Sequence, residues 1–384
     1  MQNGIRLCHS FATGAREAAQ EFYATVAQPN MALAVFFCCS EYDLDVLGAE
    51  MRRLFGGVQV VGCTTAGEIG PRGYGERGIA GASFSADVCV AASGRVDGLQ
   101  RFESSEGQSF CRRLWRELEG KAPQANPRNS FALLLIDGLS MREEPVSCAV
   151  QNALGEVPLV GGSAGDGMNF GRTYVFADGS FQSDSAALAV LTTPLPFKVF
   201  KTQHFVPTDR RLVTTEADTA RRIVKEIDGL PAAERYARLV GAEANEVDAT
   251  RFAASPVVVL IGGNTYVRSI QKANPDGSMT FFCAIEEGLV LRIARGVNLV
   301  ENLERAFAEI RAEIGEPQVV VSFDCILRKL EIQQRGLAER VGRILERNRA
   351  IGFSTYGEQF RGVHVNQTLS GVAIGSTARE GQDV

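Results

Sequence analysis

The sequence predicts an α/β protein with two domains, built from repeated β-α-β-loop-β units with mixed sheets flanked by helices. Three observations lead to this fold class. A phrase of the form G-x-[ST]-T-x-G-E occurs at 62–68 and at 352–358, and an imperfect copy lies between them at 161–166. Each copy lies at the end of a short apolar run. The 384 residues also exceed what one ordinary hydrophobic core accommodates, which favours two domains.

The first unit begins with an apolar strand at 32–37 and continues with a helix at 43–55. Leucine and methionine recur at helical spacing in this helix, so they form one buried face. A strand and the loop phrase follow at 58–68, and another apolar strand lies at 78–86. The order predicts two parallel strands joined by a crossover helix.

The second and third units repeat this order, with roughly 25 to 30 residues between their first two strands, the length of a crossover with its helix. The second unit has a strand, a helix and two further strands at 131–137, 142–154, 157–161 and 186–193. The third unit has the same elements at 318–324, 336–348, 349–352 and 368–375. A hairpin is predicted at 174–179, because Asp178-Gly179 is a strong turn signal.

The text between the second and third units differs from the repeats. Strands around a proline-bearing linker are predicted at 194–215, and helices at 217–228 and 231–241. Two apolar runs at 257–263 and 281–285 predict further strands. We therefore expect an N-terminal domain at 1–205 and a C-terminal domain at 206–384.

Composition and charge exclude several classes of protein. The net charge of −5 argues against nucleic-acid binding, which needs a basic face. No apolar run approaches the ~20 residues of a membrane helix, and the N-terminus does not resemble a signal peptide. The nine cysteines form no C-x-x-C pair and no zinc pattern, which suits a reducing compartment. We expect a cytoplasmic protein.

The repeated phrase is not a phosphate loop, because Ile-Gly-Pro-Arg-Gly follows Glu68 and cannot begin a helix. Its hydroxyls and carboxylates lie at the carboxyl ends of strands, where open α/β sheets bind ligands. The candidate ligand-binding residues are Thr64, Thr65, Glu68, Ser163, Ser354, Thr355, Glu358 and Asn366. The alternative is a recurrent tight turn in which these side chains cap backbone amides.

The other titratable residues give no clear catalytic set. The three histidines, His9, His204 and His364, are far apart in sequence and do not suggest a metal site. Asp137, Asp166 and Asp324 follow strands or glycines and are expected to be helix caps, or else loop acceptors.

Several phrases together resemble the FIST sensory family, with its N-terminal and C-terminal domains. The phrases are VVGCTTAGEI at 60–69, LVGGSAGDGMNF at 159–170, the junction text at 212–241, SFDCILRK at 322–329, and GFSTYGE with HVNQT at 352–368. The resemblance implies a cytoplasmic sensor of small ligands, not an enzyme, that acts on a signalling partner. The ligand is an amino acid or a similar metabolite in the general proposal for the family.

The stand-alone form of the chain resembles the NosP branch of that family. This resemblance implies non-covalent haem b, nitric-oxide sensing, and regulation of a histidine kinase or a cyclic-di-GMP enzyme in a two-component or biofilm pathway. His204 is the expected iron ligand, near Phe197, Phe200 and Phe205, and His364 is its rival.

Three alternatives stay open at this stage. One is a haem-independent sensor of an amino-acid-like metabolite. Another is an enzyme with Cys325 or Cys63 as nucleophile, although no base is recognisable beside either residue. A homodimer is the third, and the sequence does not decide it.

Overall fold

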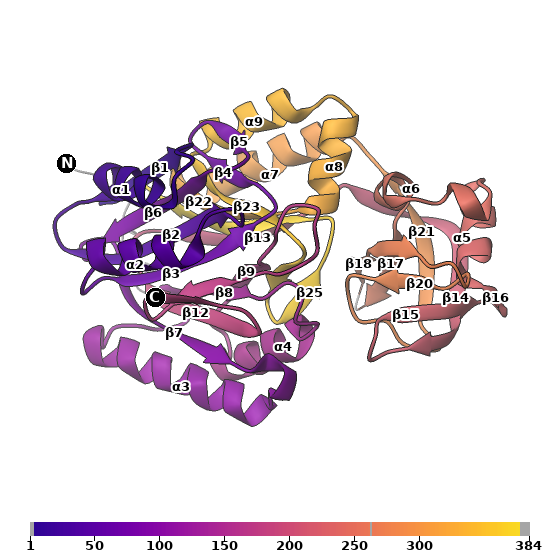
Figure 1. Ribbon diagram of the computed structural model, residues 1–384, viewed down its shortest axis with the longest axis horizontal. Helices are drawn as coiled ribbons and strands as arrows, with labels where there is room; N and C mark the ends of the chain where they lie inside the picture. The colour runs from indigo at the N-terminus through magenta and orange to yellow at the C-terminus, as the bar shows by residue number, and fades with distance from the viewer. Residues whose placement is uncertain (1–3, 262, 377–384) are drawn as a thin grey trace.

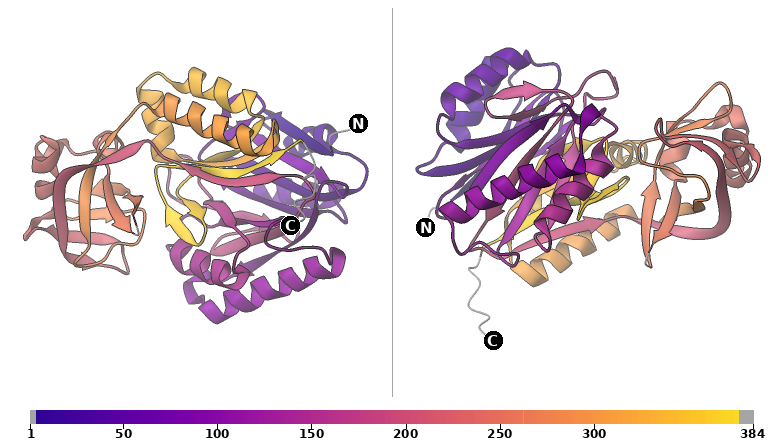
Figure 2. Two further views of the ribbon diagram at one scale, coloured as in Figure 1. Left: turned by 180° about the vertical axis from the view of Figure 1, so that it is seen from behind. Right: turned by 90° about the horizontal axis from the view of Figure 1, so that it is seen from below.

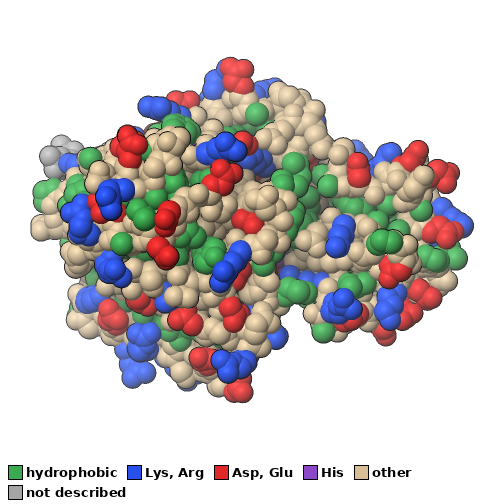
Figure 3. All heavy atoms as spheres, viewed as in Figure 1, with side chains coloured by type: hydrophobic (Ala, Val, Ile, Leu, Met, Phe, Trp, Pro, Cys, Tyr) green, Lys and Arg blue, Asp and Glu red, His purple; other side chains and the backbone are tan. Residues whose placement is uncertain are grey.

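A computed structural model describes residues 4–261 and 263–376 as a large body and a smaller domain (Figure 1). The body contains three six-stranded mixed sheets, each covered by helices on its outer face. The smaller domain lies in sequence between the second and third repeated units and projects from one end of the body (Figure 2). Figure 3 shows the same two lobes in space-filling form, with an indentation between them. The predicted α/β fold class is confirmed.

The first sheet is formed mainly by the first unit. In order across the sheet its strands are β1 (Ile5–Ser10), β6 (Ile79–Ser85), β2 (Met31–Cys39), β3 (Gln59–Thr65), β10 (Val175–Ala177) and β11 (Ser180–Gln182). Strands β2 and β3 are parallel and are joined by α2 (Leu44–Leu54), as predicted. Helix α2 begins where the Asp43 carboxylate accepts a hydrogen bond from the Val46 amide at 3.0 Å.

The other two sheets have the same plan. The second consists of β25 (Val363–Val365), β24 (Glu358–Phe360), β9 (Leu159–Ser163), β8 (Ser130–Ile136), β12 (Ser185–Thr192) and β7 (Val90–Asp97). The third consists of β13 (Phe197–Thr202), β26 (Leu369–Gly375), β22 (Pro317–Cys325), β23 (Ala350–Thr355), β4 (Glu68–Gly70) and β5 (Gly73–Gly75). Their crossover regions contain α4 (Glu143–Leu154) and α9 (Ala338–Arg347), close to the predicted ranges.

In each unit a short hairpin pairs with a strand of another unit. Hairpin β4–β5 of the first unit pairs with β23 of the third, and hairpin β24–β25 of the third pairs with β9 of the second. Hairpin β10–β11, between β9 and β12 of the second unit, pairs with β3 of the first. The exchange is therefore cyclic and ties the three units into one body.

The body has a central core between the inner faces of the three sheets. Phe37 of the first sheet stacks against Phe323 and Phe353 of the third, with ring centroids 6.2 and 4.8 Å apart. Leu133 of the second sheet belongs to the same buried cluster. The outer faces carry the helices not yet described, namely α1 (Ala15–Val26), α3 (Ser104–Lys121) and α7 (Leu299–Ile314). Apolar burial on both faces explains why the sheet strands are nearly continuous hydrophobic runs.

The smaller domain is an antiparallel sheet with two short helices. Its strands are β14 (Phe205–Asp218), β15 (Ile223–Ile227), β16 (Leu230–Pro231), β17 (Val257–Ile261), β18 (Asn264–Arg268), β19 (Ile270–Ala273), β20 (Met279–Phe281) and β21 (Val290–Gly296). Its helices are α5 (Ala232–Val240) and α6 (Ala249–Ala254). The predicted helix at 231–241 is confirmed as α5.

The predicted helix at 217–228 is wrong. The segment forms the end of β14, a turn, and strand β15. Arg222 in this turn has a φ of 54°, a left-handed conformation that does not continue a helix. β-Branched residues such as Ile223 and Val224 suit a pleated strand.

Other local predictions are met to different degrees. The hairpin at Asp178-Gly179 is confirmed, and both residues have positive φ, as a two-residue turn requires. The strand expected at 281–285 ends at Phe281, and of the run at 257–263 the structure describes a strand to Ile261, with residue 262 outside the described residues.

The predicted division at 205/206 lies where the chain leaves the body, at the start of β14. The chain returns to the body at α7, so residues 299–376 pack with the three sheets. Across 4–261 and 263–376, no helix has both the length and the apolar character needed to cross a bilayer.

Candidate ligand site where the three units meet

The three loop phrases meet on one side of the body and hydrogen-bond to one another. The Ala66 amide donates to the Ser354 carbonyl at 3.0 Å, and the Ser163 amide donates to the Gly357 carbonyl at 2.8 Å. The Gly165 amide closes the ring by donating to the Thr64 carbonyl at 3.0 Å. Because each loop satisfies the backbone of another, the phrase has a structural role in every unit.

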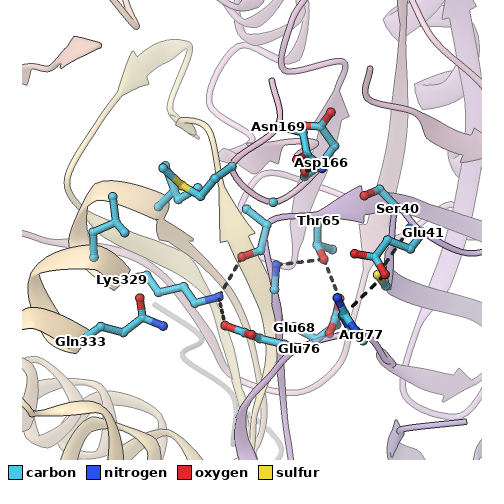
Figure 4. Close-up of a pocket in the computed structure, with 17 residues that line it drawn as sticks. Ser40, Glu41, Thr65, Glu68, Glu76, Arg77, Asp166, Asn169, Lys329 and Gln333 are labelled. Carbon is cyan, nitrogen blue, oxygen red and sulfur yellow. Dashed lines mark hydrogen bonds and ion pairs between the residues drawn. The ribbon is translucent and has the colours of Figure 1, made fainter. Parts of the chain in front are cut away.

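A cavity of about 310 Å³ opens beside this ring (Figure 4). All three units contribute to its wall: the first supplies 39–41, 65–68, Glu76 and Arg77, the second supplies 166–169, and the third supplies α8 (Ile326–Gln334). The cavity therefore lies at the carboxyl ends of β2 and β3, at the edge where α/β sheets hold ligands.

Glu68 and Thr65 form the buried part of the wall. The Thr65 hydroxyl donates to Glu68 Oε1 at 2.6 Å, and the Gly78 amide donates to Oε2 at 3.1 Å. Burial raises the pKa of Glu68 to about 7, although these two hydrogen bonds and the charge of Lys329 act to lower it. Glu68 can therefore exchange a proton near neutral pH, and its carboxylate form suits an ammonium group.

Lys329 on α8 supplies the cation of the cavity. Its Nζ donates to the Ala66 carbonyl at 2.9 Å and lies 3.3 Å from Glu76 Oε1 (Figure 4). Gly67 makes room for this ammonium, because a Cβ on Gly67 would lie 2.4 Å from Nζ. Its φ of +118° also disfavours any residue with a side chain.

Asp166 shapes the side of the cavity that the second unit provides. Its carboxylate accepts hydrogen bonds from the amides of Phe170, Gly171 and Arg172 at 2.8–2.9 Å, and from the Tyr356 hydroxyl. Asp166 is therefore a hydrogen-bond acceptor for a loop, which was the second role that the sequence left open, and it does not cap a helix. Asp137 likewise holds a loop, through the Leu139 amide at 3.0 Å.

Asp324 is not a helix cap either. It is buried between Arg328, whose Nε lies 3.0 Å from its Oδ1, and the Tyr74 hydroxyl, which donates to it. The expectation that the three aspartates cap helices is wrong. Asp137 and Asp166 accept hydrogen bonds from loop amides, and Asp324 pairs with two buried side chains.

The candidate residues of the third unit lie together but away from the cavity wall. Glu358 is completely buried, and its Oε2 accepts from the Thr368 amide at 3.1 Å and hydroxyl at 2.5 Å. The Thr355 hydroxyl donates to the Ser163 carbonyl at 2.7 Å. Asn366 Nδ2 donates to the Tyr356 carbonyl at 3.4 Å, and Ser354 is buried beside these residues.

Thr64 and Ser163 also serve local contacts. The Thr64 hydroxyl accepts from the Tyr174 amide at 3.1 Å, and Ser163 Oγ accepts from Gln359 Nε2 at 2.9 Å. Of the eight candidate ligand-binding residues, the structure places Thr65 and Glu68 in the cavity wall.

Family comparisons agree with this architecture. The FIST N domain matches residues 32–230, and the FIST C domain matches residues 232–361. The chain belongs to the FIST family. FIST domains are sensory domains that bind small ligands in signalling systems. Sensor domains of this kind pass their signal to partner proteins.

Two further proteins are similar to this FIST chain over different lengths. Uncharacterized protein MJ1623 of Methanocaldococcus jannaschii is 22% identical over 199 residues, which are 50% of this chain and 38% of that relative. A solved cyanuric acid hydrolase, described as an evolutionary innovation by structural concatenation, has 8% identity and a TM-score of 0.38, over 96% of this chain and 99% of the hydrolase chain. This likeness is too low to carry a conclusion.

His204 lies at the junction between the body and the smaller domain. Its Nε2 is 2.9 Å from Glu331 Oε2 on α8, and the side chain is buried. Burial lowers the pKa of His204, although the hydrogen bond to Glu331 and the charge of that carboxylate act to raise it. Of the three phenylalanines expected around it, Phe205 lies beside it with ring centroids 4.2 Å apart, whereas Phe197 and Phe200 pack in hydrophobic clusters of the body. These residues, as arranged, do not fit an axial haem ligand with an aromatic pocket around it.

His364, the rival ligand, is buried beside Gly357 and lies 3.3 Å from Gln359 through its Nδ1. Among the described residues, no group of three or more His, Cys, Asp or Glu side chains is arranged to hold a metal ion. Burial raises the pKa of the Cys63 and Cys325 thiols well above the usual value, which disfavours the thiolate that a nucleophile needs.

Sequence reasoning missed the contribution of α8. In the sequence Lys329 is only the last residue of a family phrase, and Ala66, which it contacts, is 263 positions away. A signal was nevertheless present: α8 contains Arg328, Lys329 and Glu331, too many charges for a helix that follows a buried strand directly.

Proposed function

We propose that the cavity beside Thr65 and Glu68 is the ligand site of this sensor and that it binds an amino-acid-like metabolite. The observation that carries the proposal is the pairing of one buried carboxyl with one largely buried ammonium on the same wall. Glu68 is 1% exposed, and the Lys329 side chain is 10% exposed. A ligand with an ammonium and an acidic group complements this pair.

The size and lining of the cavity support the same ligand class. About 310 Å³ suits a small metabolite, at the lower end of the range for ligand pockets. Ala66, Ile326 and Leu330 supply apolar surface for a side chain. Glu41 and Arg77, whose ion pair is 3.5 Å long and exposed, flank the mouth.

A thermal-shift screen tests the proposal. The probes are the twenty common amino acids, together with matched compounds that lack either the amino or the carboxyl group. A ligand at one hundred times its Kd adds about 2.7 kcal/mol to the free energy of unfolding. We expect at least one amino acid to stabilise the wild type and neither of its truncated analogues to do so. Equal stabilisation of wild type and Glu68→Gln by that amino acid contradicts the proposal.

Haem binding, nitric-oxide sensing and a histidine kinase or cyclic-di-GMP partner stay predictions from the sequence. An absorption spectrum after reconstitution with haem tests them. If His204 is an iron ligand, His204→Ala removes or reshapes the Soret band, while His364→Ala leaves it unchanged. A spectrum like that of free haem contradicts the haem prediction and leaves the cavity proposal standing.

A further inference from the structure

We propose that helix α8 transmits the state of the cavity to the smaller domain, so that ligand binding changes how the two lobes contact each other. The inference rests on the proposed function, since it treats the cavity as the ligand site. It adds the path by which a change in the occupancy of that site reaches the smaller domain.

Helix α8 has the right position for this role. Figure 1 shows it next to α6, where the smaller domain joins the body. One side of α8 lines the cavity through Ile326, Lys329, Leu330 and Gln333. At its C-terminal end, Gln334 Nε2 donates to the hydroxyl of Thr250 on α6 at 3.1 Å. The same nine-residue helix thus touches the cavity and the smaller domain.

The charged residues of α8 are buried, and their partners lie in different parts of the molecule. Buried charges are stable only when paired, so each of these contacts is held firmly. Lys329 reaches the loop of the first unit, and Arg328 pairs with Asp324 at the end of β22. Glu331 pairs with His204, where the chain enters the smaller domain.

His204 joins both crossings of the chain between the lobes. It immediately precedes β14, on the outgoing crossing, and its carbonyl accepts a hydrogen bond from the Val297 amide, on the returning one, at 2.7 Å. Its ring also lies against Gly296, where a Cβ would approach the imidazole to 3.4 Å. A change in the His204–Glu331 contact therefore acts on both crossings at once.

Glu331 can exchange partners without losing all of its stabilisation. Its Oε1 is 2.8 Å from Nη1 of Arg335, the residue that follows the last residue of α8, in addition to its contact with His204. Burial alone would raise the pKa of Glu331, but His204 and Arg335 together hold it below its usual value. With Arg335 as a remaining partner, the carboxylate is satisfied in two arrangements, as a switch requires.

The ligand acts on this helix through Lys329. In this structure Nζ is held by the Ala66 carbonyl at 2.9 Å and by the Glu76 carboxylate at 3.3 Å, and a ligand carboxylate competes with both acceptors. Capture of Nζ by the ligand removes the link between α8 and the first-unit loop. Lys329 and Glu331 are two positions apart on one short helix, so a shift of α8 changes the His204 contact.

Amide hydrogen exchange on the full chain, without ligand, tests the route. The variants are Lys329→Met, Glu331→Gln and the double variant, and the readouts are α6 (Ala249–Ala254) and the Val297 amide. We expect each single variant to speed exchange at both sites about tenfold, a change of about 1.4 kcal/mol in opening free energy. Exchange in the double variant should be no faster than in the faster single variant, because both substitutions interrupt the same route.

The control is Lys121→Met, which removes another lysine–glutamate pair, 2.7 Å long, on α3 of the body. It should leave exchange in α6 and at Val297 at the wild-type rate. Lys329→Gln keeps a donor for Ala66 and guards against a folding defect, and it should give a smaller change with the same pattern. The proposal is overturned if both Lys329 variants leave α6 and Val297 within about twofold of wild type, or if the double variant is additive.

This experiment separates the two proposals. If no amino acid binds but the Lys329 variants loosen α6, the ligand assignment fails and the α8 route stands. If an amino acid binds at the Glu68 cavity and the Lys329 variants change hydrogen exchange only at residues 65–68, the ligand site stands and the α8 route fails.

Discussion

Glu68 and Glu358 occupy the same position in two copies of one loop, but their surroundings differ. Each carboxylate accepts a hydrogen bond of 3.1 Å from the amide ten residues further on, Gly78 in the first unit and Thr368 in the third. Glu68 then borders a cavity, whereas Glu358 is enclosed by the Thr368 hydroxyl and Cys325. The repeat therefore preserves the conformation of the loop, and the neighbouring segments determine whether its carboxylate borders a cavity.

The difference arises at the end of the first strand of each unit. After β2 the chain forms a short loop that includes Ser40 and Glu41, and this loop leaves space beside Glu68. After β22 the chain continues directly into α8, and Cys325 at that transition lies against Glu358. One copy is consequently open to small molecules and the other is part of the core.

The largest expected effect is the loss of stability in Glu358→Ala. The substitution leaves a cavity in the core and a buried Thr368 amide without its acceptor, which should cost about 4 kcal/mol. Glu358→Gln should cost less than about 1 kcal/mol, because the carboxamide oxygen of glutamine can accept the same hydrogen bonds from the Thr368 amide and hydroxyl in nearly the same volume. Urea unfolding measures both, and equal losses would show that Glu358 is not enclosed.

Glu68 should make stability depend on pH. Its folded pKa of about 7 exceeds the ordinary 4.5, so the folded state holds a proton that the unfolded state loses between these values. The resulting stabilisation is complete below pH 4.5 and is lost as the pH rises through 7. Relative to Glu68→Gln, the wild type should lose about 3 kcal/mol of unfolding free energy across this window. Parallel pH profiles of the two proteins would refute the assignment.

The two equivalent glycines should differ in their tolerance of alanine. A Cβ on Gly357 would lie 2.1 Å from the buried His364 ring, so Gly357→Ala should cost about 2 kcal/mol and leave the ligand site intact. Gly67→Ala meets the ammonium end of Lys329 and a strained φ, so it should reduce ligand binding as well as stability. Thermal unfolding with and without the amino acid found in the screen compares them, and unchanged binding in Gly67→Ala would count against the site.

The smallest effect concerns the paired threonines. Thr65→Val and Thr355→Val each remove hydrogen bonds of one hydroxyl and should each cost about 1 kcal/mol. Only Thr65→Val should raise the pKa of Glu68, because the Thr65 hydroxyl stabilises that carboxylate. The midpoint of the pH–stability profile measures the shift, and a shift of equal size in Thr355→Val would remove the distinction.

The sequence was sufficient to predict the three units, because each crossover depends on local periodicity between neighbouring strands. It could not predict the hairpin exchange, which pairs β4 with β23 across almost 290 residues. The phrase also contains Thr65 and Glu68, which line the cavity, but it could not separate them from Ser354 and Glu358, which do not. That separation depends on Lys329 and on the loop around Asp166, which reach the cavity only through tertiary packing.

Calorimetric titration of the stabilising amino acid tests the central claim most directly, with wild type, Glu68→Gln and Glu358→Gln compared at pH 8, where the Glu68 carboxylate predominates. The open first-unit loop predicts that wild type and Glu358→Gln bind with the same affinity, and that Glu68→Gln binds at least tenfold more weakly, a loss of about 1.4 kcal/mol. Equal affinity in wild type and Glu68→Gln, or loss of binding in a folded Glu358→Gln, would contradict the account.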